Sequence, residues 1–122
     1  MIDVERVDFV SVLTQDIPRA KHFYGETLGL PIETEGENDL EFTLGQVTLD
    51  VFNPASIGQP FTPSSAGIAI RVRDVPAARS ELESKGVEFD GETRDTGVCH
   101  MAFFKDPDGN VLVLHRRYAP HE

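Results

Sequence analysis

Four polar side chains within apolar, strand-like segments could carry out chemistry: Asp50, Arg71, His100 and His115. Two imidazoles and one carboxylate are a ligand set for a divalent metal that leaves positions open for a substrate. A histidine beside a carboxylate can also transfer protons near neutral pH. Either use requires three strand registers to bring Asp50, His100 and His115 together. In the competing interpretation the histidines are partly exposed and hydrogen-bonded, and Asp50 pairs with Arg71.

The segments around these residues occur twice. Each copy begins with an apolar strand, continues with an aspartate, an aliphatic residue and a proline, and then has a helix that ends at a glycine. The aspartates, Asp16 and Asp74, are 58 positions apart, whereas the glycines, Gly29 and Gly86, are 57 apart. The second helix is therefore one residue shorter. A repeat of this length indicates two copies of one supersecondary unit.

Both copies are predicted to run strand, helix, three strands. Asp16 and Asp74 are suited to accept first-turn amides as N-caps, and a proline is tolerated in that turn. The segment 106–110 is typical of a hairpin turn in which Gly109 supplies a positive φ. The predicted strands are 6–14, 31–35, 40–44, 47–52, 67–73, 87–89, 98–105 and 110–116, and the predicted helices are 17–28 and 75–85.

These elements predict one α+β domain over residues 1–122. Repeat one covers about residues 6–53, a linker rich in proline, serine and threonine covers 54–65, and repeat two covers about 66–117. A chain of 122 residues is long enough to bury a hydrophobic core without disulfides.

Charge and composition limit the classes of molecule that the chain is expected to bind. The formal net charge is −10, from 21 acidic and 11 basic residues, and such a field repels nucleic acid. The charge is compatible with a cationic ligand, or simply with a well-solvated surface. No apolar run approaches the length of a membrane span, which predicts no membrane partner. Cys99 is the single cysteine, so we predict a reducing, cytoplasmic location.

The chain resembles the vicinal oxygen chelate superfamily, which includes glyoxalase I, extradiol dioxygenases, fosfomycin-resistance enzymes and bleomycin-resistance proteins. The resemblance lies in the βαβββ–linker–βαβββ order and in two segments, 16–30 (DIPRAKHFYGETLGL) and 103–110 (FFKDPDGN). It implies two βαβββ repeats that form a cupped mixed sheet, a small-molecule site inside the cup, and a homodimer. These segments are turns and caps, so they specify the fold rather than the reaction.

The resemblance also implies four metal positions, one in the first and last strand of each copy. They fall on Phe9, Asp50, Gly67 and Val113. Three of these residues have no ligating side chain, so we predict no cofactor and no family metal site. A divalent metal remains an alternative through a displaced set of Asp50, His100 and His115. His115 shares a face with Val113 by strand alternation. His100 belongs to a neighbouring strand, and the sequence does not decide on which face of the sheet it lies.

We therefore predict a small-molecule binding protein of this superfamily without the family metal site. The alternative is a metal-dependent lyase, isomerase or dioxygenase with the displaced site, or an acid–base catalyst; in both, the catalytic candidates are Asp50, His100 and His115. Two further interpretations stay open: a cup filled by its own side chains, and a structural module of a larger assembly. Small residues beside aromatic ones, with a few polar groups, favour a pocket. The predicted ligand-binding residues are Phe9, Ser11, Phe52, Gly67, Arg71, Val113 and His115.

Overall fold

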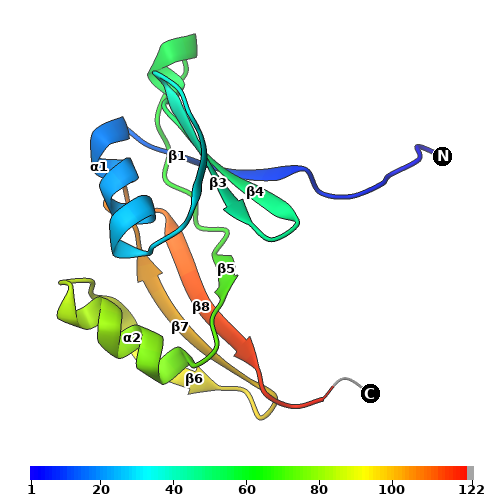
Figure 1. Ribbon diagram of the computed structural model, residues 1–122, viewed down its shortest axis with the longest axis vertical. Coiled ribbons are helices and arrows are strands. Elements are labelled where there is room, and N and C mark those ends of the chain that lie inside the picture. The colour runs from blue at the N-terminus through cyan, green and yellow to red at the C-terminus, as the bar shows by residue number, and fades with distance from the viewer. Residues whose placement is uncertain (121–122) are drawn as a thin grey trace. The chain divides into compact units, whose positions relative to one another are not determined.

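The structure, a computed structural model, describes residues 1–120. The chain forms two compact units, Met1–Thr62 and Pro63–Glu122, and each contains one βαβββ repeat (Figure 1). The boundary between the units lies inside the predicted linker. The predicted α+β class with two βαβββ repeats is thus confirmed, and each repeat has its own four-stranded mixed sheet.

The first unit has the strand order β1-β4-β3-β2, with β1 parallel to β4 and the other pairs antiparallel. The predicted first strand is too long at its start, because pairing with β4 begins only at Phe9. The elements are β1 (Phe9–Leu13), α1 (Ile17–Lys21), η1 (His22–Thr27), β2 (Ile32–Glu35), β3 (Asp39–Leu44), β4 (Val47–Phe52) and the short 3-10 helix η2 (Pro54–Ile57).

The second unit repeats this plan with the order β5-β8-β7-β6 and with β5 parallel to β8. The predicted strand at 87–89 is wrong in extent, because β6 continues to Asp95. Its sequence is mostly polar and lacks hydrophobic alternation, so only backbone pairing with β7 at the sheet edge defines it. The elements are β5 (Ile68–Arg71), α2 (Val75–Ser84), β6 (Phe89–Asp95), β7 (Cys99–Lys105) and β8 (Val111–Arg117).

Each unit's helix begins at the predicted aspartate. Asp16 Oδ1 accepts a hydrogen bond from the Arg19 amide at 3.0 Å, and Asp74 Oδ1 accepts one from the Ala77 amide at 2.9 Å. These bonds satisfy donors that have no partner inside the helix. No helix among residues 1–120 is long and apolar enough to cross a membrane.

The extra residue in the first repeat is accommodated as a π-helical turn, which the sequence prediction missed. From His22 to Thr27 the hydrogen bonds run five residues back, as in the 2.8 Å bond from the Leu28 amide to the Phe23 carbonyl. The shift lets consecutive aromatic residues be buried together: Phe23 and Tyr24 are 7% and 0% exposed, and their rings meet edge-on at 5.3 Å. The shorter second helix is regular α-helix.

In each unit one face of the sheet packs against the helix, and α2 lies across β6, β7 and β8 (Figure 1). We call this the helix-covered face and the other the helix-free face. The helix-covered faces supply most of the buried core. Their buried residues are Val12, Leu40, Phe42, Leu49 and Val51 in the first unit, and Ala102, Phe104, Leu112 and Leu114 in the second.

A buried polar turn joins β7 to β8 and fixes the start of β8. Asp106 Oδ1 accepts the amides of Asp108 and Asn110, both at 2.9 Å, and its Oδ2 accepts Asn110 Nδ2 at 2.8 Å. Asn110 Oδ1 accepts the Ser64 amide at 2.8 Å, which ties the linker to the turn. Gly109 takes the expected positive φ of 90°. The predicted hairpin turn is confirmed.

We expect Asn110→Ala to lower the free energy of unfolding by about 1–3 kcal/mol, because it leaves the Ser64 amide and one Asp106 oxygen without this partner. Urea denaturation measures the change. The control is Asn38→Ala, the same substitution at an exposed bend. Equal effects of the two substitutions would contradict a stabilising role for the turn.

Candidate functional site

The pairing of β5 with β8 decides which predicted site residues share a face in the second unit. Ala69 lies opposite Val113, and Arg71 lies opposite His115. Paired residues point to the same side of a sheet, and successive residues alternate. Arg71, Val113 and His115 therefore lie together on the helix-free face of the second sheet.

His100 lies on the other side of the same sheet. It pairs with Arg116, whereas the next residue, Met101, pairs with His115. Because His115 and Arg116 are consecutive in β8, their side chains point to opposite faces. The register thus places His100 and His115, two members of the displaced metal set, on opposite faces of the second sheet. Among residues 1–120, no three His, Cys, Asp or Glu side chains are placed to hold a metal ion.

Asp50 lies on the helix-free face of the first sheet. Its Oδ2 accepts a hydrogen bond at 3.1 Å from the hydroxyl of Ser11, its register partner in β1. Partial burial raises the pKa of Asp50 above its ordinary value, and the negative charges of Asp39 and Glu41 add to the rise. The Ser11 hydrogen bond opposes it. The neighbouring strand β3 therefore makes this face acidic.

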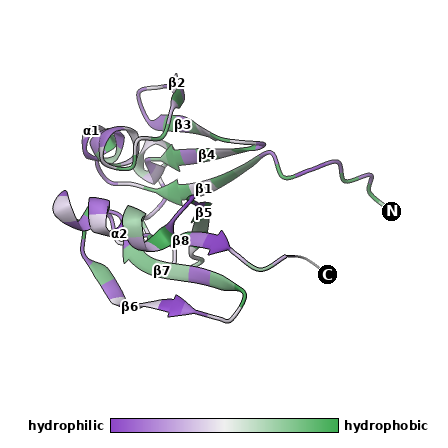
Figure 2. Ribbon diagram, turned by 60° about the horizontal axis from the view of Figure 1, so that its bottom comes forward, coloured by the Kyte–Doolittle hydropathy of each residue, from purple (hydrophilic) through white to green (hydrophobic). Residues whose placement is uncertain are grey.

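The two helix-free faces carry opposite charges. The first has the carboxylates Asp39, Glu41 and Asp50, and none of its strands contains a lysine or arginine within the described residues. The second is mainly basic, and β8 changes from hydrophobic to hydrophilic toward its C-terminal end (Figure 2). By register, its basic residues are Arg71, Arg94, Lys105 and Arg117, and the imidazole of His115 lies among them; the acidic residues on this face are in β6.

A cavity of about 360 Å³ lies at the C-terminal ends of β5 and β8, lined by Arg71, His115, Arg117 and Ala119. The Arg71 side chain makes no hydrogen bond or ion pair within the described part of the second unit. Arg117 donates from Nη2 to the Pro120 carbonyl at 3.2 Å, while its buried Nε has no acceptor among the described atoms. Guanidinium groups with unused donors can bind a carboxylate or phosphate through paired hydrogen bonds.

A second polar cluster follows β8. The Tyr118 hydroxyl donates to Asp95 Oδ1 at 2.6 Å, and this bond, assisted by the Gly97 amide, lowers the pKa of Asp95. The same bond raises the pKa of Tyr118, because ionisation would remove the donor. His100 Nε2 lies 3.4 Å from Asp95 Oδ2, and its ring centroid is 4.8 Å from that of Tyr118. The two rings are thus held by one carboxylate.

Comparison with known proteins assigns this architecture to a family. The sequence model of the Glyoxalase/Bleomycin resistance protein/Dioxygenase superfamily matches residues 6–114. The chain belongs to this superfamily. A relative from Vibrio parahaemolyticus, named a probable lactoylglutathione lyase, is 28% identical over 112 residues, which is 81% of each chain.

Two solved structures from Streptomyces sp. CB03234 support the superfamily assignment. One is a glyoxalase/bleomycin resistance protein that is 30% identical, with a TM-score of 0.73 and coverage of 91% of this chain and 100% of that one. The other is TnmS3, described as an antibiotic binding protein; it is 28% identical, with a TM-score of 0.78 and coverage of 96% and 99%.

The residues at the metal positions implied by the superfamily resemblance do not fit a metal. Of Phe9, Asp50, Gly67 and Val113, only Asp50 has a ligating side chain. Gly67 has a φ of 76° immediately before β5, and a Cβ there would lie 3.5 Å from Val113 Cγ2. Two of the four positions are therefore apolar neighbours of one another.

The remaining predicted ligand-binding residues lie in the first unit. Phe9, Ser11 and Phe52 share the helix-free face with Asp50, because β1 and β4 pair with Ser11 opposite Asp50 and Leu13 opposite Phe52. Phe9 is 58% exposed, so its ring is not part of the core.

Sequence reasoning missed Arg117 and Ala119 in the first cavity and the contact between Asp95 and Tyr118. Strand alternation could have predicted Arg117, because a residue two positions after His115 in the same strand lies on the same face. The Asp95 contact had no local signal, because β6 was predicted to end six residues too early.

Replacing Asp50 by asparagine should stabilise the protein at neutral pH. The folded-state pKa of Asp50 is raised, so the folded state holds its proton more tightly than the unfolded state does. Wild-type stability therefore falls as the pH rises from the unfolded value of 3.8 through the higher folded value. Asp50→Asn avoids this loss. Thermal unfolding should show a higher Tm for the variant at pH 7 and no difference well below pH 3.8. The control is Asp3→Asn in the exposed N-terminal segment, and a similar gain from it would contradict the local cause.

Replacing Tyr118 by phenylalanine should raise the pKa of Asp95 toward its ordinary value. The hydroxyl bond is the largest cause of the lowered pKa, while the bond from the Gly97 amide remains in the variant. A lowered carboxyl pKa stabilises the folded state above the unfolded pKa, and this contribution is lost as the pH falls through the folded value. The variant should therefore be less destabilised by acid. A carbon-13 NMR titration of the Asp95 carboxyl measures the shift, and an unchanged pKa would rule out the hydrogen bond as its cause.

Proposed function

We propose that this chain is a small-molecule binding protein that holds an organic anion on the helix-free face of its second sheet, without a resident metal ion. The observation that carries the proposal is the cavity lined by Arg71, His115 and Arg117, in which Arg71 has no acceptor within the described part of its unit. A ligand with a carboxylate, sulfonate or phosphate group would supply that acceptor.

The same face offers apolar contact for the rest of such a ligand. Phe103 pairs with Val113 in the next strand, and Met101 pairs with His115. Phe103 and Met101 are only partly buried, so their side chains retain accessible apolar surface. A cavity with a few convergent polar groups beside apolar surface is the usual form of a small-molecule site.

Local charge outweighs net charge in this proposal. The net charge of −10 is compatible with a cationic ligand, but the acidic residues on strands are concentrated on the helix-free face of the first sheet and on β6. At distances of a few ångströms the unpaired guanidinium of Arg71 dominates the field, because salt screens more distant surface charges. We therefore infer an anionic ligand group.

One structural neighbour supports binding as the function. TnmS3 is described as an antibiotic binding protein, and it matches almost the whole chain. The alternative, a metal-dependent lyase, isomerase or dioxygenase built on Asp50, His100 and His115, has weaker support because the two histidines lie on opposite faces of the second sheet. A homodimer and a cytoplasmic location remain predictions of the sequence.

We expect Arg71→Met to weaken the binding of organic anions by about ten-fold or more, because the substitution removes the free guanidinium and retains a side chain of similar length. The measurement is a thermal-shift titration in EDTA with paired probes that share a ring: benzoate and benzylamine, 2-naphthoate and naphthylmethylamine. The anion of each pair should raise the Tm of the wild type, and the amine should not.

Arg94→Met is the matched control, since Arg94 lies on the same face but does not line the cavity. It should leave anion binding nearly unchanged. The proposal is contradicted if the amines stabilise the protein and the anions do not, if no anion stabilises it, or if stabilisation appears only after a divalent metal is added.

A further inference from the structure

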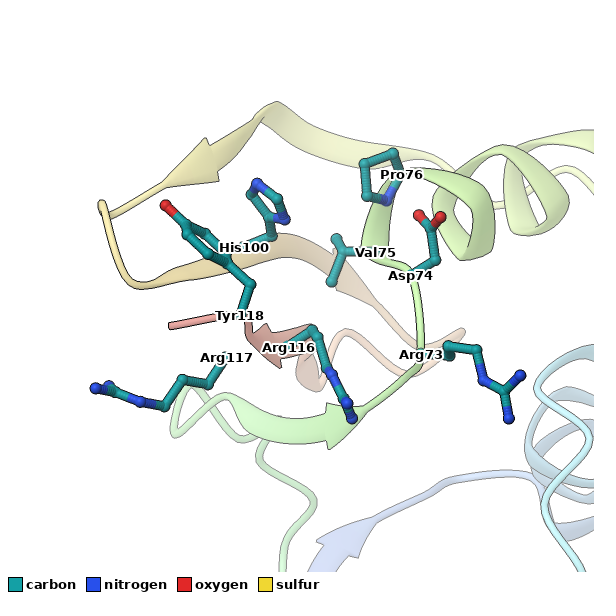
Figure 3. Close-up of a pocket in the computed structure, with 8 residues that line it drawn as sticks. All are labelled: Arg73, Asp74, Val75, Pro76, His100, Arg116, Arg117 and Tyr118. Carbon is teal, nitrogen blue, oxygen red and sulfur yellow. The ribbon is translucent and has the colours of Figure 1, made fainter. Parts of the chain in front are cut away.

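A second cavity of about 530 Å³ lies in the second unit, and its lining comes from three places in the chain (Figure 3). Arg73 and the first turn of α2 contribute one side, His100 of β7 contributes another, and the end of β8 contributes Arg116 and Tyr118. Neither the superfamily resemblance nor the proposed anion site accounts for this cavity.

This cavity is on the other side of the sheet from the proposed anion site. His100 and Arg116 are paired across β7 and β8, and both point to the helix-covered face. Arg71 and His115 point to the helix-free face and line the other cavity. Arg117, at the end of β8, borders both. The two cavities can therefore be tested separately through Arg116 and Arg71.

The second cavity has more cationic donors than acceptors. The side chains of Arg73 and Arg116 make no hydrogen bond or ion pair within the described part of the second unit, and Arg116 is partly buried. Asp74 is the one carboxylate among the described lining residues, and it is already engaged as the N-cap of α2 through the Ala77 amide. Arg73 is exposed, whereas the partly buried guanidinium of Arg116 has no acceptor, which favours an oxyanion from outside the chain.

One wall of the cavity is aromatic and held in place. The rings of His100 and Tyr118 lie side by side, with centroids 4.8 Å apart and planes inclined by 38° (Figure 3). Asp95 fixes both, through the 2.6 Å bond from the Tyr118 hydroxyl and the 3.4 Å contact with His100 Nε2. Tyr118 is still 50% exposed, so it can contact a further flat ring without losing its hydrogen bond.

We propose that this cavity is a second binding site, for a small aromatic oxyanion. The anionic oxygens contact the guanidinium groups of Arg116 and Arg73, and the ring packs against His100 and Tyr118. In the structure the guanidinium groups point in different directions (Figure 3), so binding includes a rotation of these long side chains toward the ligand. Phenyl phosphate has both required parts and is the probe.

The experiment is a titration of the nitrogen-15-labelled full chain with phenyl phosphate, inorganic phosphate and phenol, followed by two-dimensional NMR. Phenyl phosphate should shift the amides of Val75 and His100, which line this cavity and not the first, and should bind more tightly than either half alone. Arg116→Met should lower the affinity obtained from these shifts about ten-fold, and Arg71→Met should leave that affinity unchanged. Arg94→Met, which also removes one positive charge, is the control for net charge.

The aromatic contact is tested at Tyr118. Tyr118→Phe keeps the ring but removes its bond to Asp95, and it should bind phenyl phosphate more tightly than Tyr118→Leu does. Tyr118→Leu should reduce the affinity for phenyl phosphate toward that for inorganic phosphate. The inference is overturned if Arg116→Met binds phenyl phosphate like the wild type, if Arg71→Met weakens it equally, or if no shift appears at millimolar probe. Equal affinity for inorganic phosphate and phenyl phosphate would overturn the aromatic part.

Discussion

The parallel pairing of the first and last strand of each repeat is the constraint on which the rest of the structure depends. In the observed register Arg71 lies opposite His115. If β8 were shifted by one residue relative to β5, Arg116 would take the place of His115 on the helix-free face, and His115 would move to the helix-covered face. The buried turn of Asp106 and Asn110 fixes where β8 begins. The charge of each face therefore follows from register rather than from composition.

The two repeats share one scaffold and differ in the residues that their helix-free faces carry. In the first unit β3 and β4 place Asp39, Glu41 and Asp50 on that face; in the second, β5 and β8 place Arg71, His115 and Arg117 there. Capping aspartates, helix-ending glycines and the apolar helix-covered faces are common to both units. These shared features stabilise the fold, so substitutions on the helix-free faces can change the charge of a face without changing the architecture.

Local signals in the sequence were sufficient for most of the fold. The aspartate caps, the Gly109 turn and the alternation in β4 each depend on neighbouring residues, and each prediction was confirmed. The π-helical turn and the length of β6 were missed, because the first depends on packing of Phe23 and Tyr24 and the second on backbone pairing at a sheet edge. The facing of His100 could not be predicted, since it depends on a register between two separate strands.

The central claim is that this member of the superfamily binds its ligand with side chains and without a resident metal. Metal content per chain tests it most directly, on untagged protein purified without chelators and measured again after incubation with manganese, iron, nickel and zinc. The account predicts far less than one metal per chain under every condition. Near-stoichiometric metal that disappears in Asp50→Ala or His115→Ala would contradict it and would show a metal site built on those residues.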